Sequence, residues 1–575
     1  MKVSTTKWRF WQVAIVVVAM ATCWCWFAFG APYTLYTKEQ LVLFVADWTA
    51  VLDYFARPAL LSSIVGDYLT QFYLLICGGA TILTIVAALL WWGVRSALRR
   101  FDVPSQNATV WALLPVVAEV ALNCHVEYPL AMTLGAVAAT WSFVAWARMG
   151  DGVCKWLLAM LLAVVLYWAV GAHAMMFVVL SVAWLCRQRR WGWALTLMLL
   201  AGVAEMVIGR MLYLPASQAY CYPLIENYMF QHCQLFLLTE AAVVVALIGI
   251  GIRRAWIGAL AVVMASIAGV AAIFDDTMEY WLGMSCEYYF NRKERILERA
   301  DENWERKSYV ATYYTNLVLA ERGELGEYLT ENYQPATYGL LLDVDESSGY
   351  CYAMAAADAT AAIGDMAEAQ RATLLAMTFT PHQRSSRVAK KMVEIAMTVG
   401  DKELAEKFLW QLERTALHRE WAANRRAELV SGAVPSDEVR ANLVEKDGFV
   451  GANNWYPALY ALVEANGANR MAVDYLLSMH LLRKDRERFL DDYERYFYPR
   501  WGAQPPKVYQ QALMMSFDDE SELMAAIERY GISAEVQRDC IDYSRIYVSE
   551  GGRGEALQER FSRTYWFYCN YAQMN

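Results

Sequence analysis

The sequence predicts an all-α protein in two parts, a polytopic bundle of transmembrane helices followed by a water-soluble array of helical repeats. The 575 residues are 58% hydrophobic and 14% aromatic, which is too apolar for one soluble globule. The charge changes sign along the chain. Residues 1–274 contain 16 Lys and Arg against 11 Asp and Glu, a net charge of +5, whereas the remainder contains 34 against 48, a net charge of −14. We therefore expect a membrane domain over 1–280 and a soluble α-helical domain over 287–575.

Apolar runs near bilayer-spanning length are found only in the first part. Nine are candidate spans: 10–30, 70–94, 108–122, 130–147, 155–170, 173–186, 191–214, 234–252 and 255–274. The fifth and sixth are short and separated only by Gly171-Ala172-His173, so a shallow or re-entrant pair is an alternative there. If the first run were a cleaved signal peptide, eight spans would remain. It lacks a clear small-x-small cleavage site, which favours an uncleaved anchor.

Basic residues predict the orientation of these spans, because short loops rich in Lys and Arg stay in the cytoplasm. They fall before the first span and in every second connection: Lys2, Lys7 and Arg9; Arg95, Arg99 and Arg100; Arg148 and Lys155; Arg187, Arg189 and Arg190; Arg253 and Arg254. This alternation predicts a cytoplasmic N-terminus and an extracytoplasmic C-terminal domain.

The first outside loop, 31–69, combines charges with an apolar stretch, EQLVLFVADWTAVLDYFARP, that is suited to lie along the membrane interface as a helix. Its charged residues include Lys38, Glu39, Asp47, Asp53, Arg57 and Asp67.

Further ionisable residues gather at the predicted outer ends of the spans. The stretch NCHVEYP places His125 and Glu127 at the tip of a hairpin, and His173 and His232 fall on the same predicted side. Carboxylates near membrane depth are costly and indicate function; they are Glu119, Glu205, Glu240, Asp275 and Asp276. The three histidines suggest a shared metal or proton-transfer site. The alternative is that these polar groups only tolerate the interface, with Arg210 paired to Glu205 or to lipid headgroups.

The second part shows helical patterns broken by glycines, at Gly323, Gly364, Gly400 and more loosely at Gly467. The spacing is typical of helical-hairpin repeats and weakly resembles tetratricopeptide repeats. Such arrays bind partner proteins, although this one could serve only to pack on the membrane domain. Residues 431–454 are expected to form a long loop. Among the scattered cysteines, only Cys221 and Cys233 share an outside loop, where a disulfide is one option.

The layout of an N-inside bundle, an acidic first outside loop and an extracytoplasmic repeat domain resembles the GT-C class of glycosyltransferases. That resemblance implies a polyprenyl-phosphate sugar donor and a first-loop carboxylate as general base. The adjacent acidic pair common in that class is missing from this loop. The sequence is also similar to a bacterial family of multispanning membrane proteins of unknown function, through the stretch ARPALLSSIVGDYLTQFYL. These resemblances imply a location in the bacterial inner membrane.

Two functions follow as hypotheses. In the first, Asp47 or Glu39 deprotonates an acceptor hydroxyl beside His125 and Glu127, while Arg57 or Arg210 holds the lipid phosphate. A divalent metal stays open as cofactor. In the second, the protein is a non-catalytic membrane scaffold whose repeats recruit an envelope partner. A transporter is less favoured, because the ionisable residues gather on one side. The sequence shows no P-loop, GxSxG, HExxH or dinucleotide fingerprint and no nucleic-acid patch.

Overall fold

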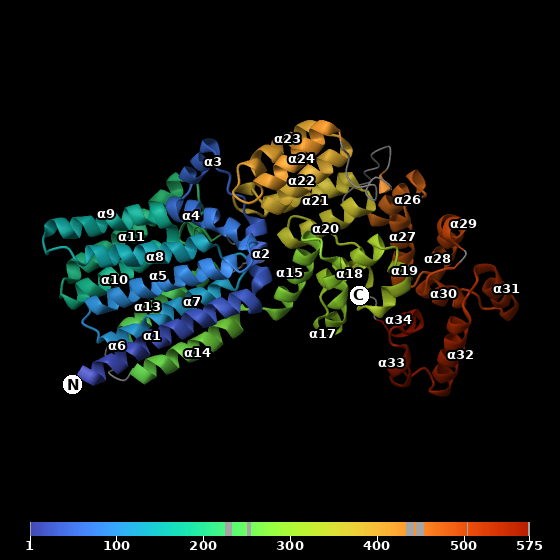
Figure 1. Ribbon diagram of the computed structural model, residues 1–575, viewed down its shortest axis with the longest axis horizontal. Coiled ribbons are helices and arrows are strands. Elements are labelled where there is room, and N and C mark those ends of the chain that lie inside the picture. The colour runs from blue at the N-terminus through green and yellow to red at the C-terminus, as the bar shows by residue number, and fades with distance from the viewer. Residues whose placement is uncertain are drawn as a thin grey trace. The chain divides into compact units, whose positions relative to one another are not determined.

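The computed structural model describes residues 2–224, 233–249, 255–432, 442–443, 453–502 and 504–572. Within these ranges every regular element is a helix, which confirms the predicted all-α class (Figure 1). The chain divides into two compact units. Unit 1 comprises 1–279, 380–389 and 409–424; unit 2 comprises 280–379, 390–408 and 425–575.

Unit 1 is a bundle of apolar helices with shorter helices between them. Its helices are α1 (Lys2–Cys25), α2 (Pro32–Leu41), α3 (Trp48–Leu52), α4 (Leu60–Thr70), α5 (Gly78–Arg100), α6 (Ser105–Trp111), α7 (Leu113–Asn123), α8 (Leu130–Trp146), α9 (Val153–Val170), α10 (Ala174–Arg187), α11 (Trp191–Met211), α12 (Ala216–Ala219), α13 (Leu237–Ile248) and α14 (Ala255–Ile273).

Five described segments of unit 1 are long and apolar enough to cross a membrane. They are Phe10–Gly30, Gly78–Arg100, Val153–Arg187, Trp191–Met211 and Ala255–Ile273. On α5, Leu90 and Val94 are fully buried while Ile85 and Trp92 on the opposite side are exposed. A helix that is apolar on its exposed side as well as its buried side suits a lipid environment. These segments support membrane association, while the count of nine spans stays a prediction.

The apolar segment Val153–Arg187 contains two helices, α9 and α10, which pack against each other. The chain turns between them at Gly171, whose φ of +72° favours glycine. A side chain at Gly171 would also meet the Tyr222 carbonyl at 2.3 Å. The turn brings His173, at its end, into the interior of unit 1, where the side chain is fully buried.

The first loop of unit 1 folds into α2, α3 and α4, and α4 packs against α8 and α9. Two short segments from far along the chain complete this part of the unit. The Ser385 hydroxyl donates to the backbone carbonyl of Gln40, and Arg387 Nη1 donates to Gln40 Oε1. The Arg414 carbonyl accepts a hydrogen bond from the backbone N–H of Ala46 at 2.8 Å.

Unit 2 consists mainly of short helices, and α22–α24 contribute to both units. The helices from residue 276 onward are α15 (Asp276–Tyr289), α16 (Lys293–Glu298), α17 (Asn303–Arg306), α18 (Tyr309–Glu321), α19 (Leu325–Tyr328), α20 (Tyr350–Ile363), α21 (Met366–Thr378), α22 (Ser386–Val399), α23 (Lys402–Glu413), α24 (Arg419–Ser431), α26 (Trp455–Ala465), α27 (Arg470–Leu482), α28 (Arg486–Asp492), α29 (Tyr498–Trp501), α30 (Lys507–Met514), α31 (Glu520–Tyr530), α32 (Ala534–Ser549), α33 (Glu555–Phe561) and α34 (Tyr565–Tyr571).

The predicted glycine turns coincide with ends of these helices. Helix α20 ends at Gly364 with φ +102°, and Asp365 then caps α21 by accepting from the Glu368 N–H. Gly323 and Gly400 also have positive φ, after α18 and α22. The class of repeat stays a prediction. Most of the expected 431–454 loop, His232 and the side chain of Cys233, and hence the possible disulfide, lie outside the described residues.

Candidate functional site

The hairpin NCHVEYP joins α7 to α8 by a tight turn. The His125 N–H donates to the Leu122 carbonyl, the Tyr128 N–H donates to the His125 carbonyl, and the Glu127 N–H donates to His125 Nδ1 at 3.2 Å. His125 and Glu127 are half-buried, whereas Tyr128 is fully buried. The turn therefore buries Tyr128 completely, together with most of Asn123, Cys124 and Val126.

Glu119 on α7 lies at the centre of a buried polar network. Its carboxylate accepts hydrogen bonds from Tyr128 Oη at 3.1 Å, Thr133 Oγ1 at 2.8 Å and Thr239 Oγ1 at 2.7 Å. His173 Nε2 lies 3.2 Å from Glu119 Oε1. Two carboxylate oxygens are thus surrounded by four donor groups, which offsets the cost of burying the charge.

His173 joins Glu119 to a second carboxylate. Its Nδ1 lies 2.7 Å from Oε1 of Glu240 on α13, and all three side chains are buried. Because each ring nitrogen faces a carboxylate oxygen, the geometry fits an imidazolium that donates from both nitrogens. The other oxygen of Glu240 has no hydrogen-bond partner among the described residues.

The network continues to the first loop through Lys38 on α2. Lys38 Nζ donates to the Asn123 carbonyl at 2.8 Å, and Asn123 Nδ2 donates to Thr133 Oγ1 at 2.8 Å. Burial lowers the pKa of Lys38 to about 7, against the opposing effects of Cys124 and Glu119. The buried ammonium is therefore near the point of losing its proton at neutral pH.

Glu39, beside Lys38, forms a separate buried pair. Its Oε1 lies 2.8 Å from Nε2 of His418, and each of these side chains is 1% exposed. The Thr415 hydroxyl accepts from the His418 backbone N–H at 3.0 Å and fixes the turn that carries the ring. Glu39 Oε2 is buried without a hydrogen-bond partner among the described residues. One oxygen of this carboxylate is thus bonded and oriented, while the other keeps its accepting capacity.

The other acidic candidates of the first loop have structural partners. Asp47 is the N-cap of α3, where it accepts from the Thr49 N–H at 3.0 Å and from the Thr49 hydroxyl. The Thr49 hydroxyl lowers the pKa of the Asp47 carboxyl. Asp53 pairs with Arg384 at 2.6 Å, and Asp67 accepts from Tyr54 Oη at 2.7 Å.

The candidate phosphate-binding residues lie at the surface of unit 1. Arg210, in the last turn of α11, and Arg57 are both exposed, and within the described ranges neither forms an ion pair. Arg57 Nη1 contacts the Leu212 carbonyl at 3.5 Å, two residues beyond Arg210. The structure therefore places the two cations near one end of α11, outside the Glu119 network. Glu205, on the same helix, is buried, and among the described residues no ion pair joins it to Arg210, which was one alternative for this arginine.

No group of three or more His, Cys, Asp or Glu side chains in the described part of the chain is arranged to hold a metal ion. The imidazoles of His173 and His418 each face carboxylates, an arrangement suited to orienting protons.

Sequence reasoning identified Glu39, Glu119, Glu240 and His173 but missed His418. That histidine is 379 residues from Glu39 in the chain, and no local pattern indicates the pairing. The role of Asp47 did have a signal, since an aspartate two residues before a threonine at a helix start is a typical N-cap.

The model of a protein family described as a family of unknown function, DUF6057, matches residues 6–572. The chain therefore belongs to this family, which confirms the resemblance to a family of unknown function. No curated protein and no solved structure matches it.

Proposed function

We propose that this DUF6057 member transfers a sugar from a polyprenyl-phosphate donor at the outer face of the bacterial inner membrane, with Glu39 as the general base. The observation that carries the proposal is the buried Glu39–His418 pair, in which one carboxylate oxygen is held by the imidazole and the other has no partner among the described residues. A buried polar atom without a partner costs free energy and calls for an explanation, of which a catalytic role is one.

The reaction requires one proton acceptor and one anion-binding group. Glu39 Oε2 would take the proton of an acceptor hydroxyl as the hydroxyl oxygen attacks the anomeric carbon of the sugar. The bond from that carbon to the phosphate oxygen breaks, and polyprenyl phosphate leaves with the electron pair. His418 orients the Glu39 carboxylate through Oε1. Exposed Arg57 and Arg210 are suited to bind the lipid phosphate.

Glu39 is preferred to Asp47 as the base for two physical reasons. Asp47 already accepts two hydrogen bonds from Thr49 as a helix cap. Those bonds also lower the pKa of its carboxyl, which weakens a base at neutral pH. The half-buried His125 and Glu127 remain candidates for contacts with the acceptor.

The test uses the full chain in lipid nanodiscs with a panel of polyprenyl-phosphate sugars and an extract of envelope glycans, and measures release of polyprenyl phosphate. Glu39→Gln should slow release at least about 100-fold, the range typical of a lost general base. Asp47→Asn, the matched control in the same loop, should stay within a few-fold of the parent. Full release by Glu39→Gln would disprove the assignment of the base.

A second candidate is a non-catalytic membrane scaffold whose helical second unit recruits an envelope partner. The saturated bonding of Glu119 favours it, because a carboxylate that accepts from three hydroxyl groups and faces an imidazole has a structural role. This function predicts that no donor in the panel releases polyprenyl phosphate, and that a cross-linked envelope protein is recovered on unit 2.

A further inference from the structure

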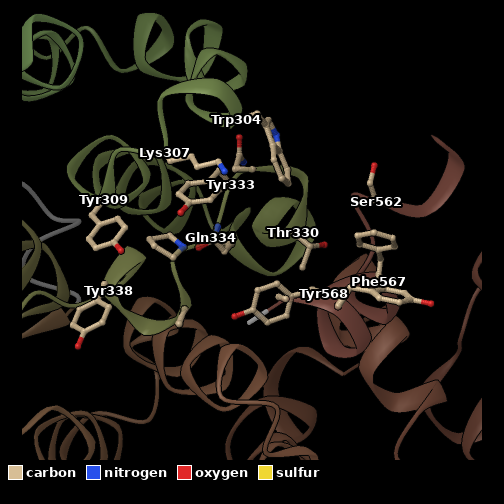
Figure 2. Close-up of a pocket in the computed structure, with 15 residues that line it drawn as sticks. Trp304, Lys307, Tyr309, Thr330, Tyr333, Gln334, Tyr338, Ser562, Phe567 and Tyr568 are labelled. Atoms are coloured by element: carbon tan, nitrogen blue, oxygen red, sulfur yellow. The ribbon is translucent and has the colours of Figure 1, made fainter. Parts of the chain in front are cut away.

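Unit 2 contains a cavity of about 470 Å³ whose lining is unusually aromatic (Figure 2). Seven of its fifteen lining residues are Trp, Tyr or Phe, against 14% aromatic residues in the whole chain. The polar lining is mostly neutral, including Asn332, Gln334 and Thr330, and Lys307 is the one charged side chain among the lining residues. The volume is in the range of small-ligand sites.

A second cavity of about 530 Å³ continues from the first, since Ala336 and Tyr338 line both. It adds Trp455 and Tyr456 together with Asp343 and Arg483. We call these two adjoining cavities together the aromatic groove.

The aromatic side chains of the groove are held in place before any ligand binds. Trp304 Nε1 donates to the Glu331 carbonyl at 3.3 Å, and Tyr568 Oη donates to the Leu482 carbonyl at 3.0 Å. The rings of Tyr309 and Tyr338 stack with centroids 6.0 Å apart and an interplanar angle of 3°. Fixed rings reduce the entropy that binding would otherwise cost.

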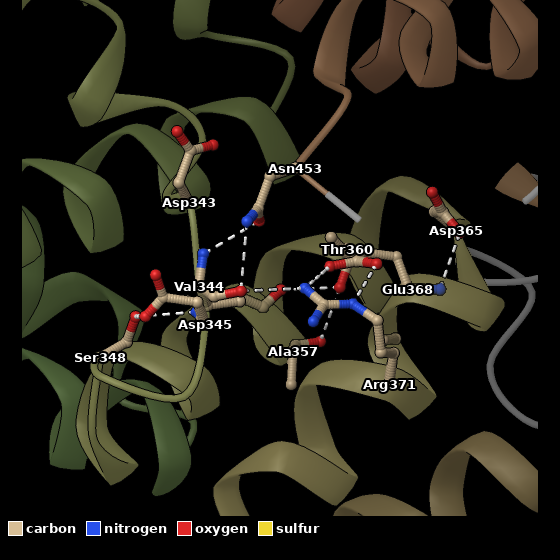
Figure 3. A network of polar contacts seen from close by, with 12 residues as sticks. Asp343, Val344, Asp345, Ser348, Ala357, Thr360, Asp365, Glu368, Arg371 and Asn453 are labelled. Atoms are coloured by element: carbon tan, nitrogen blue, oxygen red, sulfur yellow. Dashed lines mark hydrogen bonds and ion pairs between the residues drawn. The ribbon is translucent and has the colours of Figure 1, made fainter. Parts of the chain in front are cut away.

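The wall around the second cavity is also fixed by hydrogen bonds (Figure 3). Asn453 accepts from the Val344 N–H at 2.9 Å and donates to the Val344 carbonyl. Arg371 contacts the same carbonyl while it is paired with Glu368. Trp455 Nε1 donates to Asp343 Oδ1 at 2.7 Å, which sets the orientation of its indole.

We infer that the aromatic groove binds a neutral oligosaccharide. A pyranose ring has an apolar C–H face that packs on an aromatic ring, and a rim of hydroxyls that bond to amide and hydroxyl groups. A nucleic acid would require a cationic groove. The charged lining residues are Lys307, Asp343 and Arg483. Asp343 accepts from Trp455 Nε1, and the Arg483 guanidinium lies 4.7 Å from the centroid of the Tyr456 ring. The binding does not depend on the transfer reaction proposed for Glu39.

The test measures binding of chitotetraose, cellotetraose and maltotetraose, and of an array of soluble glycans, to the full chain in nanodiscs by calorimetry and saturation-transfer NMR, without any donor. At least one glycan should bind saturably. Tyr309→Ala and Tyr338→Ala should each weaken it about tenfold, as expected for a lost aromatic contact. Both side chains are exposed, at 40% and 43%, so the variants should fold.

Tyr547→Ala is the matched control, because Tyr547 is an exposed tyrosine stacked on Tyr543 and does not line the groove. It should bind as the parent does. The assay contains no donor, which separates this inference from the proposed reaction. The inference is overturned if no glycan binds, if Tyr309→Ala and Tyr338→Ala both bind normally, or if the groove selects a peptide from a random library instead.

Discussion

Replacing Glu119 by glutamine tests whether the buried network stabilises unit 1. Glutamine keeps the shape of the side chain but removes the negative charge that faces His173 Nε2 at 3.2 Å. It also turns one acceptor oxygen into an NH₂ donor, which must face one of the hydroxyl donors Tyr128, Thr133 or Thr239. We expect the free energy of unfolding to fall.

The magnitude follows from comparing the two losses. Hydrogen bonds between neutral groups in membrane proteins contribute about 0.6 kcal/mol each on average. A lost hydrogen bond to a charged group costs about 1.5–3 kcal/mol, and a buried donor left unsatisfied costs about 1–3 kcal/mol. His173 keeps Glu240 Oε1 at 2.7 Å as its charged partner, so Glu119→Gln should destabilise unit 1 by about 1.5–3 kcal/mol. Tyr128→Phe keeps the charge and should cost about 0.5–1.5 kcal/mol.

The assay is equilibrium unfolding of the full chain in mixed micelles by increasing dodecyl sulfate, followed by tryptophan fluorescence, since most tryptophans belong to unit 1. Asp102→Asn is the control: its ion pair with Arg187 is of similar length, 2.8 Å, but exposed. Removing such a surface pair should change stability by no more than about 1 kcal/mol. A Glu119→Gln loss no larger than this control would refute the argument.

Two further outcomes are expected. Burial lowers the pKa of Lys38 to about 7, so between pH 7 and pH 10 the unfolded chain binds more protons than the folded chain. The free energy of unfolding should therefore rise over this range. Lys38→Met should flatten that rise in the same unfolding assay, and an identical pH profile in the variant would contradict the argument. A reporter fused after Asn575 should be active outside the cytoplasm and not within it, because the alternating basic loops predict an extracytoplasmic C-terminal domain. Activity of the fusion in the cytoplasm would reverse the proposed topology.

The sequence predicted the helical class and the polar residues that deserved scrutiny, but not how they pair. Glu119, Glu240 and His173 can be recognised in the sequence because they are ionisable residues within or between apolar runs. Burying such groups is costly, so their presence there indicates a role. Thr133, Thr239 and Tyr128 do not stand out, because hydroxyl residues are common in apolar helices. Their role depends on which helix faces pack against each other, and tertiary packing decides this.

The first loop shows a different limit. Apolar periodicity and charge placed 31–69 outside the bilayer, but the partners of Glu39 and Gln40 come from the segments 380–389 and 409–424. These segments lie within a helical region whose pattern resembles the rest of the second half. Nothing local distinguishes a helix end that docks on unit 1 from one that ends in solvent.

The contrast between two buried carboxylates explains why the reaction is assigned to one of them. Glu119 accepts from three hydroxyl groups beside an imidazole, so it has no capacity left for a substrate proton. Glu39 and Glu240 each keep one oxygen without a partner among the described residues. Glu240 lies in the apolar helix α13, where a hydrated sugar acceptor would lose its hydrogen bonds with water. Glu39 lies on α2 in the first loop, outside the five apolar segments of membrane-spanning length, and is therefore the carboxylate to which we assign the base.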